Sequence, residues 1–331
     1  MDSKSGKNKA KKSKPKLRTK IPREMKFFVT LIVLVIISFS IWFGIKQISK
    51  GLLKSKIMKI TPEAIWGGSG SQLGKFEQPW DVALDSNGNI FVTDFSGNRV
   101  EEFGPNLKPI LEFGKAGKGP GEFNQPSGIF INDKNQVLVC DTFNSRIQEF
   151  DENGKFIRQW SHQFFGPKSI VESTTGKVYV VDTGNHQVQV FTPHGDFIRK
   201  WGGFGTANGK FREPVGCVWD PRGFLYVADS NNNRIEKFTG NGKWLETFGI
   251  PTWHGKTREM PYLAFAHGSL WASNASQNAV LRLSPNGSIQ AIYTKANGGF
   301  SGAAGIAAYN NEIYVVEKSV DMIASFLIPN N

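Results

Sequence analysis

Four aspartates at similar positions in successive segments are the first residues that could do chemistry. Each follows a short β-forming run and stands five positions before an Arg or Gln; the pairs are Asp94 and Arg99, Asp141 and Arg146, Asp182 and Gln187, and Asp229 and Arg234. Such carboxylates can act as acids or bases or bind a metal ion. Their regular recurrence instead favours a structural role, in which each Asp accepts backbone N–H groups of its own turn and pairs with the Arg.

Histidine and cysteine give little support for catalysis or metal binding. The five histidines form no HxxxH or HxH motif, and Cys140 and Cys217 lie in apolar strand patterns without CxxC spacing. The sequence also shows no Ser-His-Asp arrangement, P-loop or haem-binding CxxCH motif. We therefore expect two buried structural cysteines, and we assign no catalytic residue, no metal site and no cofactor.

The aspartates belong to a longer repeat. A proline stands about fifteen residues before each one, and the spacings between successive prolines are 47, 41, 47 and 47 for Pro79, Pro126, Pro167, Pro214 and Pro261. A period of this length with several strands per unit is typical of β-propellers. The fourth repeat contains four strand segments joined by tight turns, at 216–220, 224–228, 234–238 and 244–248. This is the pattern of one propeller blade.

The last repeat, residues 305–326, has only three strand segments. The missing strand is predicted at the start of the domain, because the sequence Ile-Trp66-Gly-Gly copies Lys-Trp201-Gly-Gly in the middle of the chain. Pairing of strand 64–68 with the last blade would close the ring and leave no free edge. We therefore predict an all-β six-bladed propeller of four-stranded antiparallel blades over residues 61–331, preceded by one transmembrane helix.

Residues 62–328 resemble the NHL-repeat family, whose signature Tyr-Val-Ala-Asp-x-x-Asn-x-Arg-Ile is closely matched in the first four repeats. The resemblance implies the six-bladed fold but says little about function, since the family includes enzymes, RNA-binding domains and extracellular binding modules. Its amidating lyases place metal-binding histidines at the central channel, and lactonase-like propellers hold calcium there with acids and Asn. The channel strands of this chain begin without a histidine, and Asp81 is the only acid at these positions.

A ligand-binding face is predicted where loops join the blades and where turns follow the second strands. The candidate residues at these places are Trp80, Phe95, Phe143, Lys168, His186, Asn232 and Tyr262. Exposed aromatic side chains among Asn and Lys suit the recognition of a glycan or a peptide, through stacking and a few hydrogen bonds. In the alternative interpretation, Trp80 and Tyr262 fill the mouth of the channel or pack between blades.

The formal net charge of +12 is concentrated at one end of the chain. Residues 1–60 carry 16 Lys or Arg and 2 acids, which leaves 24 basic and 26 acidic groups in the remainder. The predicted propeller is therefore nearly neutral and lacks the broad basic surface that binds a phosphate backbone. We predict no nucleic-acid partner.

Residues 27–45 form an apolar run without a charge. As a helix they would span roughly 28 Å, close to the thickness of a bilayer core, so the lipid bilayer is a predicted partner. Eleven basic residues precede the run and five follow it, which favours a cytoplasmic tail at 1–26 and places the linker 46–60 and the propeller outside the plasma membrane. A signal peptide cleaved near Ser38-Phe-Ser40 is the alternative.

These features predict a single-pass, membrane-anchored, extracytoplasmic propeller that binds or scaffolds a protein or glycan ligand. A metal-dependent lyase or a lactonase-like enzyme is the alternative, which a metal bound in the channel would indicate. An RNA-binding NHL domain is a third reading, and it would require a cytoplasmic propeller with a basic face.

Overall fold

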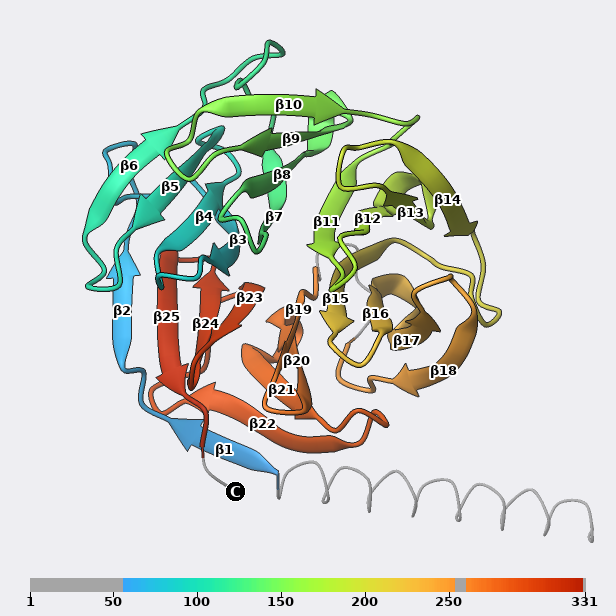
Figure 1. Ribbon diagram of the computed structural model, residues 1–331. Coiled ribbons are helices and arrows are strands. Elements are labelled where there is room, and N and C mark those ends of the chain that lie inside the picture. Colours follow the sequence, from blue (N-terminus) through green and yellow to red (C-terminus); the bar gives the residue numbers. More distant parts are fainter. Residues whose placement is uncertain (1–55, 254–259, 330–331) are drawn as a thin grey trace, which may run out of the picture. The chain divides into compact units, whose positions relative to one another are not determined.

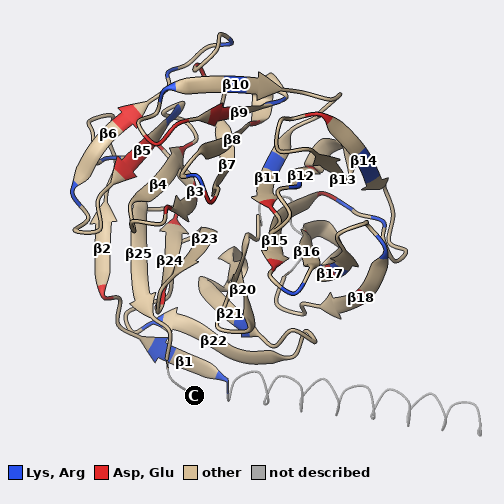
Figure 2. Ribbon diagram, in the orientation of Figure 1, with Lys and Arg blue, Asp and Glu red and all other residues tan. Residues whose placement is uncertain are grey.

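The computed structural model describes residues 56–253 and 260–329. The predicted tail, the predicted membrane anchor and most of the predicted linker lie outside these residues. Within the described ranges, no helix is long and apolar enough to cross a membrane. Six β-sheets form blades around a central axis (Figure 1), which confirms the six-bladed propeller. Both signs of charge are distributed over the ring (Figure 2).

Blades one to three follow the chain from the innermost to the outermost strand. Their strands are β3 (Pro79–Leu84), β4 (Ile90–Asp94), β5 (Arg99–Phe103) and β6 (Pro109–Phe113) in blade one; β7 (Pro126–Ile131), β8 (Val137–Asp141), β9 (Arg146–Phe150) and β10 (Phe156–Trp160) in blade two; and β11 (Pro167–Glu172), β12 (Val178–Asp182), β13 (Gln187–Phe191) and β14 (Phe197–Gly202) in blade three. The prolines of the repeat thus begin the innermost strands, where the absence of an N–H group is tolerated.

Blades four and five continue this order, and blade six contributes three strands from the end of the chain. Their strands are β15 (Pro214–Asp220), β16 (Phe224–Asp229), β17 (Arg234–Thr239) and β18 (Trp244–Gly249) in blade four; β19 (Leu263–Ala266), β20 (Ser269–Asn274), β21 (Ala279–Leu283) and β22 (Ile289–Lys295) in blade five; and β23 (Ala303–Tyr309), β24 (Glu312–Glu317) and β25 (Met322–Leu327) in blade six. Short 3-10 turns follow the second strands of blades two to five: η1 (Thr142–Asn144), η2 (Thr183–Asn185), η3 (Ser230–Asn232) and η4 (Ala275–Gln277).

Two strands from the start of the domain complete the ring. β2 (Ala64–Gly67) pairs antiparallel with β25 and supplies the fourth strand of blade six, as predicted. β1 (Ile57–Ile60) lies parallel to β22 and gives blade five a fifth strand. The linker predicted over 46–60 therefore ends in a strand. Because β1 is almost entirely exposed, its sequence lacks the alternation of apolar and polar residues that marks a half-buried strand.

In each blade the second strand is almost entirely buried and the strand at the rim is the least buried. Every residue of β4, the second strand of blade one, is buried, whereas β6 at the rim is mostly exposed. The core lies between blades, where facing sheets interdigitate; one such cluster joins Tyr179 and Val181 of blade three to Leu225 and Phe238 of blade four. The second strand of each blade is covered on both faces, which explains its near-continuous apolar run in the repeat.

The recurrent aspartates fasten the blades, as predicted. Arg234 Nε lies 2.7 Å from Asp229 Oδ2, and the same pair forms in blades one and two at 3.1 and 2.7 Å. Asp229 also accepts the N–H of Arg212 at 2.7 Å. This donor belongs to the loop before the blade, whereas the sequence suggested the aspartate's own turn. Each aspartate therefore holds the loop between blades as well as its own blade.

Candidate functional site

Large and small side chains alternate around the channel where the inner strands begin. The residue that follows the proline of the repeat is large in blades one, three and five: Trp80, Lys168 and Tyr262, the last of which directly precedes β19. The equivalent residue is small in blades two, four and six: Ser127, Val215 and Ala304. The six-fold ring therefore has a three-fold pattern at its mouth, and three blades supply the bulky groups.

The residue that follows this position also differs between alternate blades. Blades two, four and six have a glycine there, and a Cβ at Gly128 would lie 2.4 Å from the carbonyl oxygen of Lys168. A Cβ at Gly305 would lie 2.4 Å from the Cα of Asp81. Side chains are sterically excluded at both places, so the glycines allow neighbouring inner strands to approach closely.

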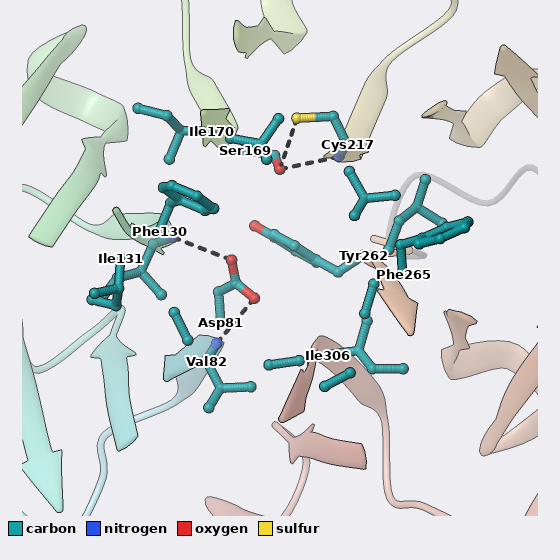
Figure 3. A pocket seen from close by; sticks show the side chains of 18 of the residues that line it. Asp81, Val82, Phe130, Ile131, Ser169, Ile170, Cys217, Tyr262, Phe265 and Ile306 are labelled. Atoms are coloured by element: carbon teal, nitrogen blue, oxygen red, sulfur yellow. Dashed lines mark hydrogen bonds between the residues drawn. The ribbon is translucent and has the colours of Figure 1, made fainter. Parts of the chain in front are cut away.

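A pocket of about 200 Å³ occupies the channel (Figure 3). Asp81 is its only acidic lining residue; its carboxyl group accepts the N–H of Val82 at 2.9 Å and, from blade two, the N–H of Ile129 at 3.2 Å. Burial raises the pKa of Asp81 to about 8, so near neutral pH this side chain can hold a proton inside the ring.

The other polar groups of the channel are hydroxyl and thiol groups. The Ser169 hydroxyl accepts the N–H of Cys217 at 3.1 Å. Burial raises the pKa of Cys217 to about 12, so its thiol is protonated at neutral pH and is a poor nucleophile. Among the described residues, no three His, Cys, Asp or Glu side chains form a group that could hold a metal ion. The carboxyl, hydroxyl and thiol groups that line the channel can form hydrogen bonds with a small polar molecule.

A second pocket, of about 540 Å³, lies over the turns of blades one to three; we call it the mouth pocket. Trp80 stacks on Phe95 at a ring-centroid distance of 4.2 Å, and Phe143 contacts Phe95 edge to face at 6.3 Å. Phe165 adds a fourth ring to the lining. Phe143 and Phe165 are 62% and 67% exposed, so two of the four aromatic rings are open to a ligand.

Three ionisable side chains line the mouth pocket: Lys168, His186 and Glu213. The Nζ of Lys168 contacts the sulfur atom of Met260 at 3.6 Å, and burial lowers the pKa of this lysine. His186 Nδ1 accepts the N–H of Glu213 at 3.1 Å. Since a backbone N–H can only donate, Nδ1 carries no proton in this arrangement and Nε2 remains for a ligand.

Five of the seven predicted site residues line the mouth pocket together: Trp80, Phe95, Phe143, Lys168 and His186. Tyr262 instead lines the channel, and its hydroxyl donates to the Lys168 carbonyl at 2.9 Å. Asn232 lies elsewhere, where its amide nitrogen donates to Asp229 at 2.7 Å and to the Gly205 carbonyl at 2.9 Å.

Trp80 and Tyr262 are less accessible than the sequence suggested. Their side chains are only 6% and 3% exposed, and both belong to one apolar cluster. The expectation that they are exposed aromatics was wrong, and the alternative interpretation of core packing describes them better. Both side chains pack in a cluster that includes Val215 of blade four and Ile306 of blade six, so residues of other blades help to bury them.

Phe165, Glu213 and Met260 also line the mouth pocket, although the sequence analysis did not select them. A signal for Phe165 existed in the repeat. The position two residues before the proline is polar in blades one, two and four, as Glu77, Asn124 and Arg212, but aromatic in blade three. An exposed aromatic at a normally polar repeat position indicates a local surface feature. Met260 has no comparable signal.

Comparison with known families supports the repeat. A family described as a 6-bladed beta-propeller matches residues 81–174, and the NHL repeat matches residues 166–191 and 211–238. The chain carries NHL repeats. The second match covers the Asp182 and Asp229 turns that fasten blades three and four. Comparison with curated proteins finds no significant match.

Solved structures with a similar fold include three lyase structures. A streptogramin B lyase structure is 14% identical with a TM-score of 0.57, covering 80% of this chain and 97% of that one. A catalytically inactive histidine-to-alanine variant of virginiamycin B lyase from Staphylococcus aureus, solved with quinupristin, is 18% identical with a TM-score of 0.58, covering 82% and 98%. Selenomethionine-substituted virginiamycin B lyase from the same organism is 17% identical with a TM-score of 0.58, covering 82% and 99%. At these identities, the likeness between this chain and the lyase structures concerns the fold alone.

Proposed function

We propose that this NHL propeller is a membrane-anchored, extracytoplasmic binding module that recognises a protein or glycan ligand in the mouth pocket. The observation that carries the proposal is the convergence of four aromatic side chains and one lysine from three blades on a single concavity. Ligand pockets in proteins typically have volumes of about 300–1,000 Å³ and combine an apolar lining with a few polar groups. The mouth pocket, with a volume of about 540 Å³, lies within this range.

The rings of the mouth pocket differ in burial, and this difference supports recognition. Trp80 and Phe95 form a stacked base, while Phe143 and Phe165 present exposed rings beside it. A rigid aromatic base with accessible rings offers large contact area at a small cost in side-chain entropy. Isolated exposed aromatics are common on protein surfaces, but here two exposed rings line the same pocket.

The proposed location rests on the sequence. The charge-free run at 27–45 and its 11 to 5 distribution of basic residues favour an anchor with the propeller outside the cytoplasm. A protease added to intact cells or spheroplasts should then remove an epitope tag placed after Asn331. Protection of the tag until the cells are lysed would contradict this orientation.

Binding can be tested with the full-length chain in detergent on arrays of defined peptides and defined oligosaccharides. We expect binding to members of one array, lost in the Phe143→Ala, Phe165→Ala double variant. Leu73→Ala is a matched control, since Leu73 is 43% exposed and does not line the mouth pocket. If both variants bind as the wild type does, or if neither array is bound, the proposal is wrong.

A further inference from the structure

Lys168 is placed unusually for a lysine. Its side chain is half-buried at the mouth of the channel, and its Nζ contacts the Met260 sulfur at 3.6 Å. Within the described residues, no carboxylate oxygen lies within 4.0 Å of this nitrogen, although the charge of Glu213 acts on it from further away. A lysine that is largely withdrawn from water without a close counter-ion binds an incoming anion more strongly than an exposed lysine does.

A second lysine reinforces the positive charge at the same place. The Nζ of Lys318 lies 5.1 Å from the centre of the Trp80 ring, and this side chain is also half-buried. Burial lowers the pKa of Lys168; the charge of Glu213 opposes this, and the smaller effect of the Lys318 charge lowers the pKa further, so the two lysines act on each other. An anion bound beside Trp80 would relieve this repulsion and would interact with both ammonium groups.

The remaining lining favours an apolar partner for that anion. Thr142 Oγ1 already donates to the Pro167 carbonyl at 2.9 Å, and Thr183 Oγ1 donates to the Pro214 carbonyl at 2.7 Å. The N–H of Glu213 occupies His186 Nδ1. Because these groups are already engaged, fewer partners remain for the many hydroxyl groups of a sugar ring, and each buried hydroxyl group without a partner costs free energy.

We infer that the mouth pocket binds an acidic peptide segment in which a carboxylate lies next to an aromatic or aliphatic side chain. This inference deepens the proposed binding function and rests on it. The carboxylate lies beside Lys168 and Lys318, and the neighbouring apolar side chain packs on the rings of Phe143 and Phe165. The peptide lies across blades one to three, where Lys168, Phe143 and Phe165 line the pocket. Lys318 does not line the pocket and approaches the Trp80 ring from blade six.

A positional-scanning array of tetrapeptides with blocked termini tests the inference on the full-length chain in detergent. The wild type should retain peptides that combine Asp or Glu with Phe, Tyr, Trp or Leu about tenfold better than the matched Asn or Gln peptides. Lys168→Met, which keeps the side-chain length, should lose this preference for acid. Lys200→Met is the matched control, because Lys200 is exposed on β14 at the rim of the same blade.

The outcomes separate the inference from the broader proposal. Equal retention of acidic and amide peptides by the wild type, or an unchanged acid preference in Lys168→Met, overturns the inference but leaves peptide binding in place. Binding confined to oligosaccharides also overturns the inference while the binding function stands. Absence of binding to both arrays overturns the two together. Circular dichroism of Lys168→Met shows whether a lost preference comes from unfolding.

Discussion

The Tyr262 hydroxyl donates a hydrogen bond to the carbonyl oxygen of Lys168 across 2.9 Å, although 94 positions separate the two residues. The bond joins blade five to blade three through the centre of the ring. It also fixes the backbone from which the Lys168 side chain reaches the mouth pocket. Tyr262 therefore positions a pocket residue without lining the mouth pocket itself.

Tyr262→Phe should lower the free energy of unfolding by about 1 kcal/mol, because it removes the shorter of two side-chain hydrogen bonds to the Lys168 carbonyl, which keeps the Ser127 hydroxyl at 3.3 Å. Tyr309→Phe is the matched control: it removes a hydroxyl-to-carbonyl bond of 3.1 Å at the exposed surface, where water can replace the donor. Urea unfolding of both variants measures the difference. Equal losses would show that the bond across the ring has no special importance.

Trp80 and Phe143 should separate packing from recognition. Trp80→Ala should cost roughly 3–5 kcal/mol of stability, since it empties a buried site under the mouth pocket. Phe143→Ala should change stability by less than about 0.5 kcal/mol, because the ring is mostly exposed, yet it should weaken ligand binding. Chemical denaturation compares the two. A large loss of stability in Phe143→Ala would assign this ring to the core.

Arg234 tests the blade fastener. Its guanidinium group contacts Asp229 at 2.7 Å and donates to the carbonyl groups of Thr206 at 2.7 Å and Lys210 at 2.7 Å. Arg234→Ala should cost roughly 3–5 kcal/mol, because it strands a buried carboxylate. Arg234→Gln should cost less, since in blade three Gln187 donates to Asp182 at 2.8 Å. Similar losses of stability in both variants would contradict the proposed role of the Asp229–Arg234 pair in fastening the blade.

Asp81 should make stability depend on pH. Burial raises its pKa from 3.8 to about 8 in the folded chain. Below pH 3.8 the carboxyl group is protonated in both states, so its contribution to stability is fully present there and is lost as the pH rises through about 8. Asp81→Asn cannot ionise, so its stability relative to the wild type should rise between pH 4 and 8. Urea unfolding across this range checks the sign, and a constant difference would contradict it.

Chains that begin at residue 56, 61 or 68 test ring closure. The chain starting at 61 lacks β1 only, whereas the chain starting at 68 also lacks β2 and exposes the edge of β25. The third should melt far lower or aggregate, since its last blade has an unpaired edge. The chain that starts at residue 61 should lose less thermal stability. Equal melting temperatures for all three would show that β2 does not stabilise the ring.

The repeat allowed much of the fold to be predicted from sequence, because each blade carries the same turn residues at the same positions. The closing strand could be recognised because Trp66 and Trp201 share a local motif. β1 could not, since it is a fifth strand that matches no position of the four-stranded repeat. The site was predicted less well. Repeat positions identify which residues lie at the mouth, but the burial of Trp80 and Tyr262 depends on packing by neighbouring blades.

The parallel pairing of β1 with β22 also affects how the domain would bear a mechanical load. Ile57 lies opposite Ile292 and Ile60 opposite Lys295, so the strands are in register over their full contact. Tension along the axis of β1, applied at residue 56, would shear these backbone hydrogen bonds together instead of peeling them apart singly. Forced unfolding is governed by the rate at which such contacts break. Under such a load, the pairing of β1 with β22 would have to break before the force acted on β2 and the closed ring.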